Sequence, residues 1–240
     1  MKKTLPTPAA SPLVSPPNVP PSTPSADYPI GWIMILGLIM AVGPLSIDMY
    51  LPALPSMAKE FGISTALMSN SVPTYFVGLV VGQLFYGPIS DRIGRIKPLY
   101  VGMMLYVIAS VLCATTQNEY LLLVARTMQA LGACVGSVVT RAMIRDRLHP
   151  KQMAKAFSLM VLVMGIAPIL APSLGSLVLK MASWRVIFWF LAGFGVLTMV
   201  LTKLYLTETL TEDTRNNRPL TEVLSQYWAL LKDERFNYPA

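Results

Sequence analysis

The sequence is poor in charged residues and in side chains that bind metals or carry redox chemistry. Lys, Arg, Asp and Glu make up 13% of the 240 residues, whereas a soluble domain usually carries about 25%. The two cysteines, Cys113 and Cys134, lie in separate apolar runs, and there is one histidine. These residues cannot supply a metal site, and no catalytic set of Ser, His and Asp lies within the apolar runs. We therefore predict no metal, no cofactor and no enzyme activity.

What the sequence has instead is hydrophobic residues, 54% of the chain, many of them in six long runs. Each run has about the 20 residues that a helix needs to cross a hydrocarbon layer of about 30 Å. Lipid offers the backbone no hydrogen-bond partners, so helices are expected rather than open strands. We predict an all-α membrane protein with six transmembrane helices. The runs are Gly31–Ala53, Asn70–Pro88, Pro98–Thr116, Tyr120–Thr140, Phe157–Leu179 and Val186–Tyr205.

Two regions of different composition flank the apolar runs. Residues 1–29 are rich in Pro, Ser, Thr and Ala, and are predicted to be disordered because they bury too little apolar surface. They lack the apolar centre of a signal peptide, so no cleavage is expected. In residues 208–240, apolar side chains recur at helical spacing between Pro219 and Phe236, which predicts an amphipathic helix. The chain thus divides into a tail, a six-helix bundle over residues 30–207, and a linker that is expected to stop before a seventh helix.

Basic residues are concentrated in two links, those after the second and the fourth apolar run. The positive-inside rule places such links in the cytoplasm, so both ends of the chain are expected there. The same rule accounts for the net charge of +7. The basic residues do not form a patch with interleaved aromatics, so the expected partner is a lipid bilayer and not a nucleic acid.

Asp48 and Arg126 are the acid and the base that lie deepest within the apolar runs. A charge at the centre of a membrane costs roughly 2.5–3.5 kcal/mol on insertion scales, so its presence suggests a function. Each residue lies about six positions, or about 9 Å, from the outer boundary of its helix. We predict that the two meet across a cavity, where Asp48 carries a proton and Arg126 influences its protonation. The alternative is an ion pair that only fixes helix packing.

A charged segment, Gly87–Lys97, follows the second run and reads GPISDRIGRIK. Its glycines permit a tight turn and a close approach of the backbone. Asp91 is expected to cap the next helix or to pair with a base such as Arg141. The pattern is too specific for a solvated turn.

This segment matches the signature G-x-x-x-D-R-x-G-R-[RK] of the major facilitator superfamily, apart from one isoleucine before the final lysine. Three more segments resemble motifs of the drug:proton antiporters in that superfamily: Ile47–Pro55, Arg126–Ala133 and Ala167–Ser176. Ala130 stands where the second of these motifs usually has glycine, as in the bicyclomycin-resistance (Bcr/CflA) branch. The sequence therefore resembles the N-terminal half of such an antiporter.

The resemblance implies two six-helix bundles, each a 3+3 repeat, with substrate between them and alternating access driven by the proton gradient. It implies that Asp48 and Arg126 couple protons to transport. The candidate residues for a substrate cavity are Tyr50, Gln83, Met128, Gln129 and Met164. The alternative is that these residues only pack against other helices or contact lipid. The cytoplasmic gate motif comprises Gly87, Asp91, Arg92, Gly94 and Arg95. The antiporter motif, which would let the fifth helix bend and pack against the other half, comprises Pro168, Pro172 and Gly175.

The expected function is proton-coupled export of small amphipathic drugs across a bacterial inner membrane. A nutrient or metabolite porter of the same superfamily is one alternative, and an inactive membrane fragment is another. Because the resemblance implies a second bundle, transport is expected to need either a missing C-terminal half or self-association.

Overall fold

The computed structural model describes residues 30–211. The predicted tail and the amphipathic segment between Pro219 and Phe236 lie outside this range. Six helical segments within it are long and apolar enough to cross a membrane, and the range contains no strand. The predicted all-α fold with six spans is therefore confirmed. In chain order the elements are α1 (Ile30–Asp48), the 3-10 turn η1 (Leu51–Ala53), α2 (Leu54–Phe61), α3 (Thr65–Ser69), α4 (Ser71–Ile93), α5 (Ile96–Thr115), α6 (Glu119–Arg147), α7 (Pro150–Met181) and α8 (Arg185–Tyr205).

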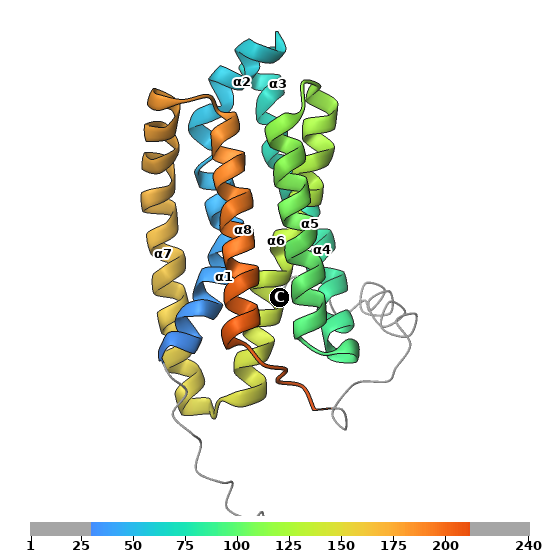
Figure 1. Ribbon diagram of the computed structural model, residues 1–240, viewed down its shortest axis with the longest axis vertical. Helices are drawn as coiled ribbons and strands as arrows, with labels where there is room; N and C mark the ends of the chain where they lie inside the picture. The colour runs from blue at the N-terminus through green and yellow to red at the C-terminus, as the bar shows by residue number, and fades with distance from the viewer. Residues whose placement is uncertain (1–29, 212–240) are drawn as a thin grey trace, which may run out of the picture.

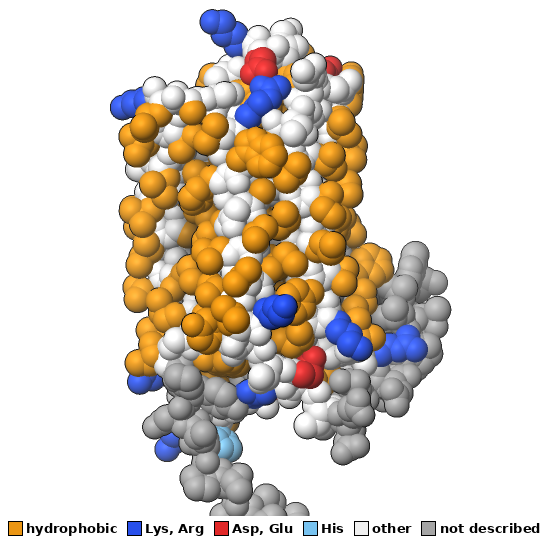
Figure 2. Space-filling view, in the orientation of Figure 1, with side chains coloured by type: hydrophobic (Ala, Val, Ile, Leu, Met, Phe, Trp, Pro, Cys, Tyr) orange, Lys and Arg blue, Asp and Glu red, His pale blue; other side chains and the backbone are white. Residues whose placement is uncertain are grey.

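The long helices stand side by side, and the described chain begins and ends at the same end of the bundle (Figure 1). The α4–α5 and α6–α7 links lie at this end, which we call the basic end because of their arginines and lysines. The short helices α2 and α3 cover the opposite end, which we call the capped end. Apolar side chains form a belt between the two ends, where most of the visible charges gather (Figure 2). Such a belt suits a bilayer.

The centre of the bundle is formed by α1 and α6. The α6 helix packs against α4, α5 and α1, while α1 packs mainly against α7, α6 and α8. Gly78 and Gly82, four residues apart on α4, lie directly against α6, and Gly136 of α6 lies against the Ile39 carbonyl of α1. Small residues at this spacing allow membrane helices to approach closely. The core is therefore built on backbone proximity as well as on large side chains.

The end of α4 differs from the sequence prediction. The helix does not stop at Pro88 but continues to Ile93. The placement of Gly87 in a turn was wrong, because this residue lies inside α4. The chain instead leaves the helix at Gly94, whose φ of 95° lies in a region that favours glycine.

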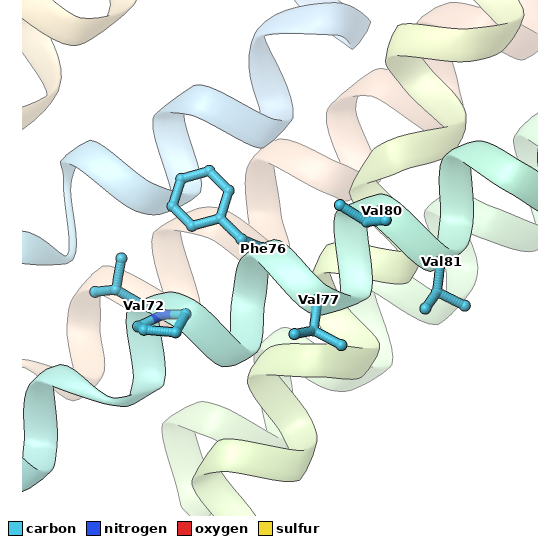
Figure 3. A pocket seen from close by; sticks show the side chains of 6 residues that line it. Val72, Phe76, Val77, Val80 and Val81 are labelled. Atoms are coloured by element: carbon cyan, nitrogen blue, oxygen red, sulfur yellow. The ribbon is translucent and has the colours of Figure 1, made fainter. Parts of the chain in front are cut away.

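The helices α4 and α7 are covered least by the rest of the bundle. In each of these two spans, only 17% of the apolar stretch that would cross the membrane is buried inside the protein. One side of α4 carries a shallow apolar groove of about 570 Å³ (Figure 3). A groove without polar side chains suits lipid or another apolar helix rather than chemistry. Its lining residues are Val72, Pro73, Phe76, Val77, Val80 and Val81.

Candidate functional site

A second, half-open cavity of about 340 Å³ is lined by residues of α1, α4, α6 and α7. Its polar lining side chains are Asp48, Gln83, Ser137 and Arg141, and the remainder of the wall is apolar or glycine. The groove on α4 is larger but has no group that can hold a proton or a charge. Because ligand sites combine an apolar wall with a few polar groups, we place the candidate site in this second cavity, the charged cavity.

Asp48 is the last residue of α1 and lines the charged cavity. The predicted continuous helix to Ala53 is interrupted just after it, where η1 begins with Pro52 at its start. Asp48 is half-buried, and it has no hydrogen-bond or ion-pair partner among residues 30–211. A carboxyl group that is left free in an apolar bundle is available to bind a proton or a cation.

Arg126, on α6, is completely buried. Its guanidinium carbon lies 4.2 Å from the centre of the Tyr50 ring and 4.4 Å from that of Tyr75. Phe188 of α8 lies near as well, at 5.7 Å. Aromatic faces attract cations, and they do so most strongly where water is excluded. The cation is thus held largely by π faces.

The hydrogen bonds of Arg126 go to neutral groups. One terminal nitrogen donates to the Ser46 carbonyl at 3.2 Å and to the Gln129 side chain at 2.7 Å. Gln129 in turn donates to Ser110 at 2.7 Å. The other two guanidinium nitrogens have no partner among the described residues. Arg126 is therefore a buried cation without a carboxylate partner in residues 30–211.

Asp48 and Arg126 do not meet in this structure. They lie at a similar depth, because Arg126 reaches the carbonyl of Ser46, two residues before Asp48. Successive helical residues are rotated by about 100°, so Asp48 lies about 200° around α1 from Ser46. Asp48 therefore lines the charged cavity, while Arg126 lies against a different side of α1. Equal depth was predictable from the sequence, but the side of the helix was not.

The predicted substrate-cavity residues fall into two groups. Gln83 and Met164 line the charged cavity. Tyr50 and Gln129 are fully buried beside Arg126 instead. Met128 is half-buried on α6 and is not among the cavity-lining residues. Two of the five thus contribute to the cavity wall, and two support the arginine behind it.

Charged side chains from three segments form a cluster at the basic end. Arg95, only 4% exposed, pairs with Asp91 of α4 and, at 2.8 Å, with Asp146 of α6. Asp91 pairs with a base, as predicted, but this base is Arg95 and not Arg141, and Asp91 does not cap α5. Arg92 is exposed on the surface. The sequence reasoning missed Asp146, although an Arg-Asp-Arg triplet at the end of an apolar helix marks it.

Glu208, in the segment after α8, caps the start of α5. The α5 start was expected to be capped by Asp91, but it receives the carboxylate of Glu208 from a distant part of the chain. Burial alone would favour the neutral form, but donated backbone N–H bonds outweigh it and hold the pKa of Glu208 below its usual range. The donors, at 2.8–3.1 Å, are the backbone N–H groups of Arg95, Ile96, Thr209 and Leu210.

The antiporter-motif residues lie in α7. Pro168 and Pro172 are both inside this helix. Gly175 is buried against the backbone of Met49, just after α1, so a side chain at this position would collide with the Met49 carbonyl. The close packing expected of Gly175 against another half is observed here against Met49 of the same bundle.

Comparison with known proteins gives matches over most of the chain. Residues 36–236 match the family model described as Major Facilitator Superfamily. The uncharacterized MFS-type transporter YdgK of Bacillus subtilis (strain 168) is 37% identical over 215 residues, covering 89% of this chain and 54% of the relative. Multidrug resistance protein D of Escherichia coli (strain K12) is 32% identical over 208 residues, covering 87% and 52%. Multidrug resistance protein MdtL of Escherichia coli (strain SMS-3-5 / SECEC) is 38% identical over 167 residues, covering 69% and 42%.

Among solved structures, the human organic anion transporter MFSD10 (TETRAN) is similar in fold. The TM-score is 0.66 at 16% sequence identity, over 80% of this chain and 52% of that chain. The chain spans about half the length of the curated relatives it matches. The family match agrees with the prediction of a transporter family rather than an enzyme. On the extent of that match, the chain belongs to the Major Facilitator Superfamily.

Proposed function

We propose that this chain forms the N-terminal half of a proton-coupled exporter of small amphipathic compounds, of the bicyclomycin-resistance type. The observation that carries the proposal is Asp48, a carboxyl group that has no partner among residues 30–211 and faces a largely apolar cavity within the membrane belt. Two relatives that are named multidrug resistance proteins support the choice of substrate class. The proposed setting is a bacterial inner membrane, with the basic end of the bundle in the cytoplasm.

In this proposal Asp48 carries the transported proton. When protonated it is neutral and tolerates an apolar wall, and when ionised it attracts a cationic group of the substrate. Proton and substrate then compete for one carboxylate, which is the basis of exchange. Arg126 holds the Ser46 carbonyl of the same helix, so a movement of α1 during transport has to change the surroundings of this buried cation.

A second bundle is part of the proposal. The uncovered sides of α4 and α7 are apolar and border the charged cavity. We propose that they face the second bundle of a complete transporter, either a C-terminal half or another copy of this chain. The charged cluster around Arg95 then acts as the cytoplasmic gate, because it ties together segments that lie at the basic end.

The test is energy-dependent efflux of a fluorescent cationic dye from a bacterial host that lacks its own drug exporters. The chain is expressed alone and also joined to the C-terminal half of E. coli multidrug resistance protein D. Efflux that stops with an uncoupler and with Asp48→Asn supports the proposal. Glu119→Gln, which removes a carboxyl group at the capped end, is the matched control and should leave efflux unchanged.

A measurement on the purified chain makes the result independent of the second bundle. Infrared difference spectra between acidic and neutral pH should contain a protonated carboxyl band that disappears in Asp48→Asn but not in Glu119→Gln. Absence of an Asp48 band, together with absence of uncoupler-sensitive efflux in both constructions, would sink the proposal.

A further inference from the structure

The charged cavity contains one acid and one base that both lack a partner within the described range. Asp48 lies on its α1 wall and Arg141 on its α6 wall. Neither has a hydrogen bond or ion pair with another residue in the described part of the chain. Asp91, the acid expected to pair with Arg141, is held by Arg95 instead. Two opposite charges are therefore exposed to the same cavity without neutralising each other.

The register of α1 and α6 shows why these charges stay apart. The two helices run in opposite directions, with Arg126 beside Ser46 and Gly136 beside Ile39. Asp48 lies beyond the first contact, towards the capped end, and Arg141 lies beyond the second, towards the basic end. At 1.5 Å per residue, their backbones are separated by about 20 Å along the bundle. Side chains lean towards the start of their helix, so the two charged groups approach each other, to about 15 Å.

The wall between the two charges is mostly apolar and adaptable. It contains two methionines, Met40 and Met164, with Ile47, Phe76 and Leu79. Methionine side chains are flexible and polarisable, and they accept apolar groups of different shapes. This wall therefore accepts ligands whose middle parts differ in shape. The ends of the cavity are selective, because Asp48 favours a positive group and Arg141 a negative one.

We propose that the charged cavity selects extended zwitterionic amphipaths, with the ammonium group at Asp48 and the carboxylate at Arg141. The inference deepens the proposed function, on which it rests, by naming the substrate class. A guanidinium binds a carboxylate through paired, charge-assisted hydrogen bonds. A ligand with a positive group alone leaves Arg141 unpaired, and one with a negative group alone leaves Asp48 unpaired, so each is discriminated against.

Binding to the purified 240-residue chain in lipid nanodiscs tests this selection. The probe is ω-aminohexanoic acid, whose extended chain, with one hydrogen-bonded contact at each end, spans the gap of about 15 Å. It is compared with its methyl ester, which keeps only the amine, and with glycine, which is too short to reach both residues. We expect the zwitterion to bind at least about tenfold more tightly than either comparison compound, as a charge-assisted bond implies.

Variants of the two charged residues show which residue binds which end of the ligand. Arg141→Gln should remove the preference for the zwitterion over the ester and leave the affinity for the ester unchanged. Asp48→Asn should weaken both. Arg145→Gln, an exposed arginine one turn further along α6, is the matched control and should change neither. Circular dichroism and the melting temperature confirm that each variant is folded.

Three results would overturn the inference. One is equal binding of zwitterion and ester by the wild-type chain. Another is a preference that survives Arg141→Gln, which would mean that Arg141 only anchors lipid headgroups. The third is no zwitterion binding at millimolar concentration. Because binding requires no transport, the two proposals can fail separately. Uncoupler-sensitive dye efflux without zwitterion selection would refute this inference alone. Zwitterion selection without efflux and without an Asp48 carboxyl band would refute the transport proposal alone.

Discussion

Glu208 accepts the backbone N–H of Arg95 with both carboxylate oxygens, at 2.8 and 3.0 Å. The contact connects the segment after the sixth span with the start of the third. It requires a glycine before Arg95, because an ideal Cβ at Gly94 would lie 2.5 Å from Oε2 of Glu208. The side chain of Arg95 meanwhile holds Asp91 and Asp146. Through its backbone and its side chain, Arg95 thus joins four segments at the basic end: α4, the start of α5, α6 and the segment after α8.

Removal of this cap should destabilise the bundle. Glu208→Ala is expected to lower the free energy of unfolding by about 1–2 kcal/mol, because α5 loses its cap and backbone N–H groups lose their acceptor. Glu208→Gln, which retains one carbonyl oxygen, should lose less. Denaturant unfolding of the purified chain measures both, with Glu119→Gln as the control. Equal stability of Glu208→Ala and the wild type would show that the cap contributes nothing.

The same carboxylate should make stability depend on pH in acid. The pKa of Glu208 is lowered by its N–H donors in the folded chain, so folding favours the ionised form. Its contribution is complete above the ordinary glutamate value of about 4.3, and it is lost as the pH falls through the lowered value in the folded chain. Melting temperatures of wild type and Glu208→Gln should therefore differ by a constant amount at neutral pH and converge in acid. A difference that grew in acid would contradict the assignment.

Gly175 should be far less tolerant of a methyl group than Gly165 on the same helix. A Cβ at Gly175 would collide with the Met49 carbonyl, whereas a Cβ at Gly165 has nothing within 4 Å. Gly175→Ala is expected to lower the free energy of unfolding by about 1–3 kcal/mol. Gly165→Ala should raise it by up to about 1 kcal/mol, because alanine favours the helix. Similar effects of both substitutions on the melting temperature would contradict the close contact between Gly175 and the Met49 carbonyl.

Lysine should not replace Arg126. Its ammonium is a compact, strongly hydrated charge, and it lacks the flat guanidinium that lies over the rings of Tyr50 and Tyr75. Arg126→Lys is expected to destabilise the chain by about 2 kcal/mol or more, since the cation is desolvated. Arg145→Lys, at an exposed position on the same helix, should be neutral. If the two variants unfolded alike, the aromatic contacts would have no energetic value.

The number of spans was predictable from the sequence, because apolar length is set by membrane thickness. The ends of the helices were less predictable. Hydropathy fell at Thr140, yet α6 continues to Arg147, since a helix can extend beyond the hydrocarbon into the polar region. Similarly, Pro88 looked like a helix end but is accommodated within α4, and the positive φ of Gly94 ends it.

Partners across the bundle were harder to predict than depth. The sequence placed Asp48 and Arg126 at one level, but the side of a helix on which a residue packs depends on its neighbours. Tyr50 and Gln129 looked suitable for a cavity, and they became the surroundings of Arg126. The cap by Glu208 joins residues more than a hundred positions apart, which no local pattern encodes.

The central position of α1 has a consequence for how the protein is made. Its main packing partners are α6, α7 and α8, and about 70 residues separate its end from the start of α6. At a synthesis rate of about 5–20 residues per second, roughly 4 to 14 seconds pass before the first of these partners leaves the ribosome. During that interval the first helix, with its aspartate, has to wait in the membrane or be held by the insertion machinery. Biogenesis of this bundle therefore depends on a late assembly step, in which the earliest helix is among the last to find its neighbours.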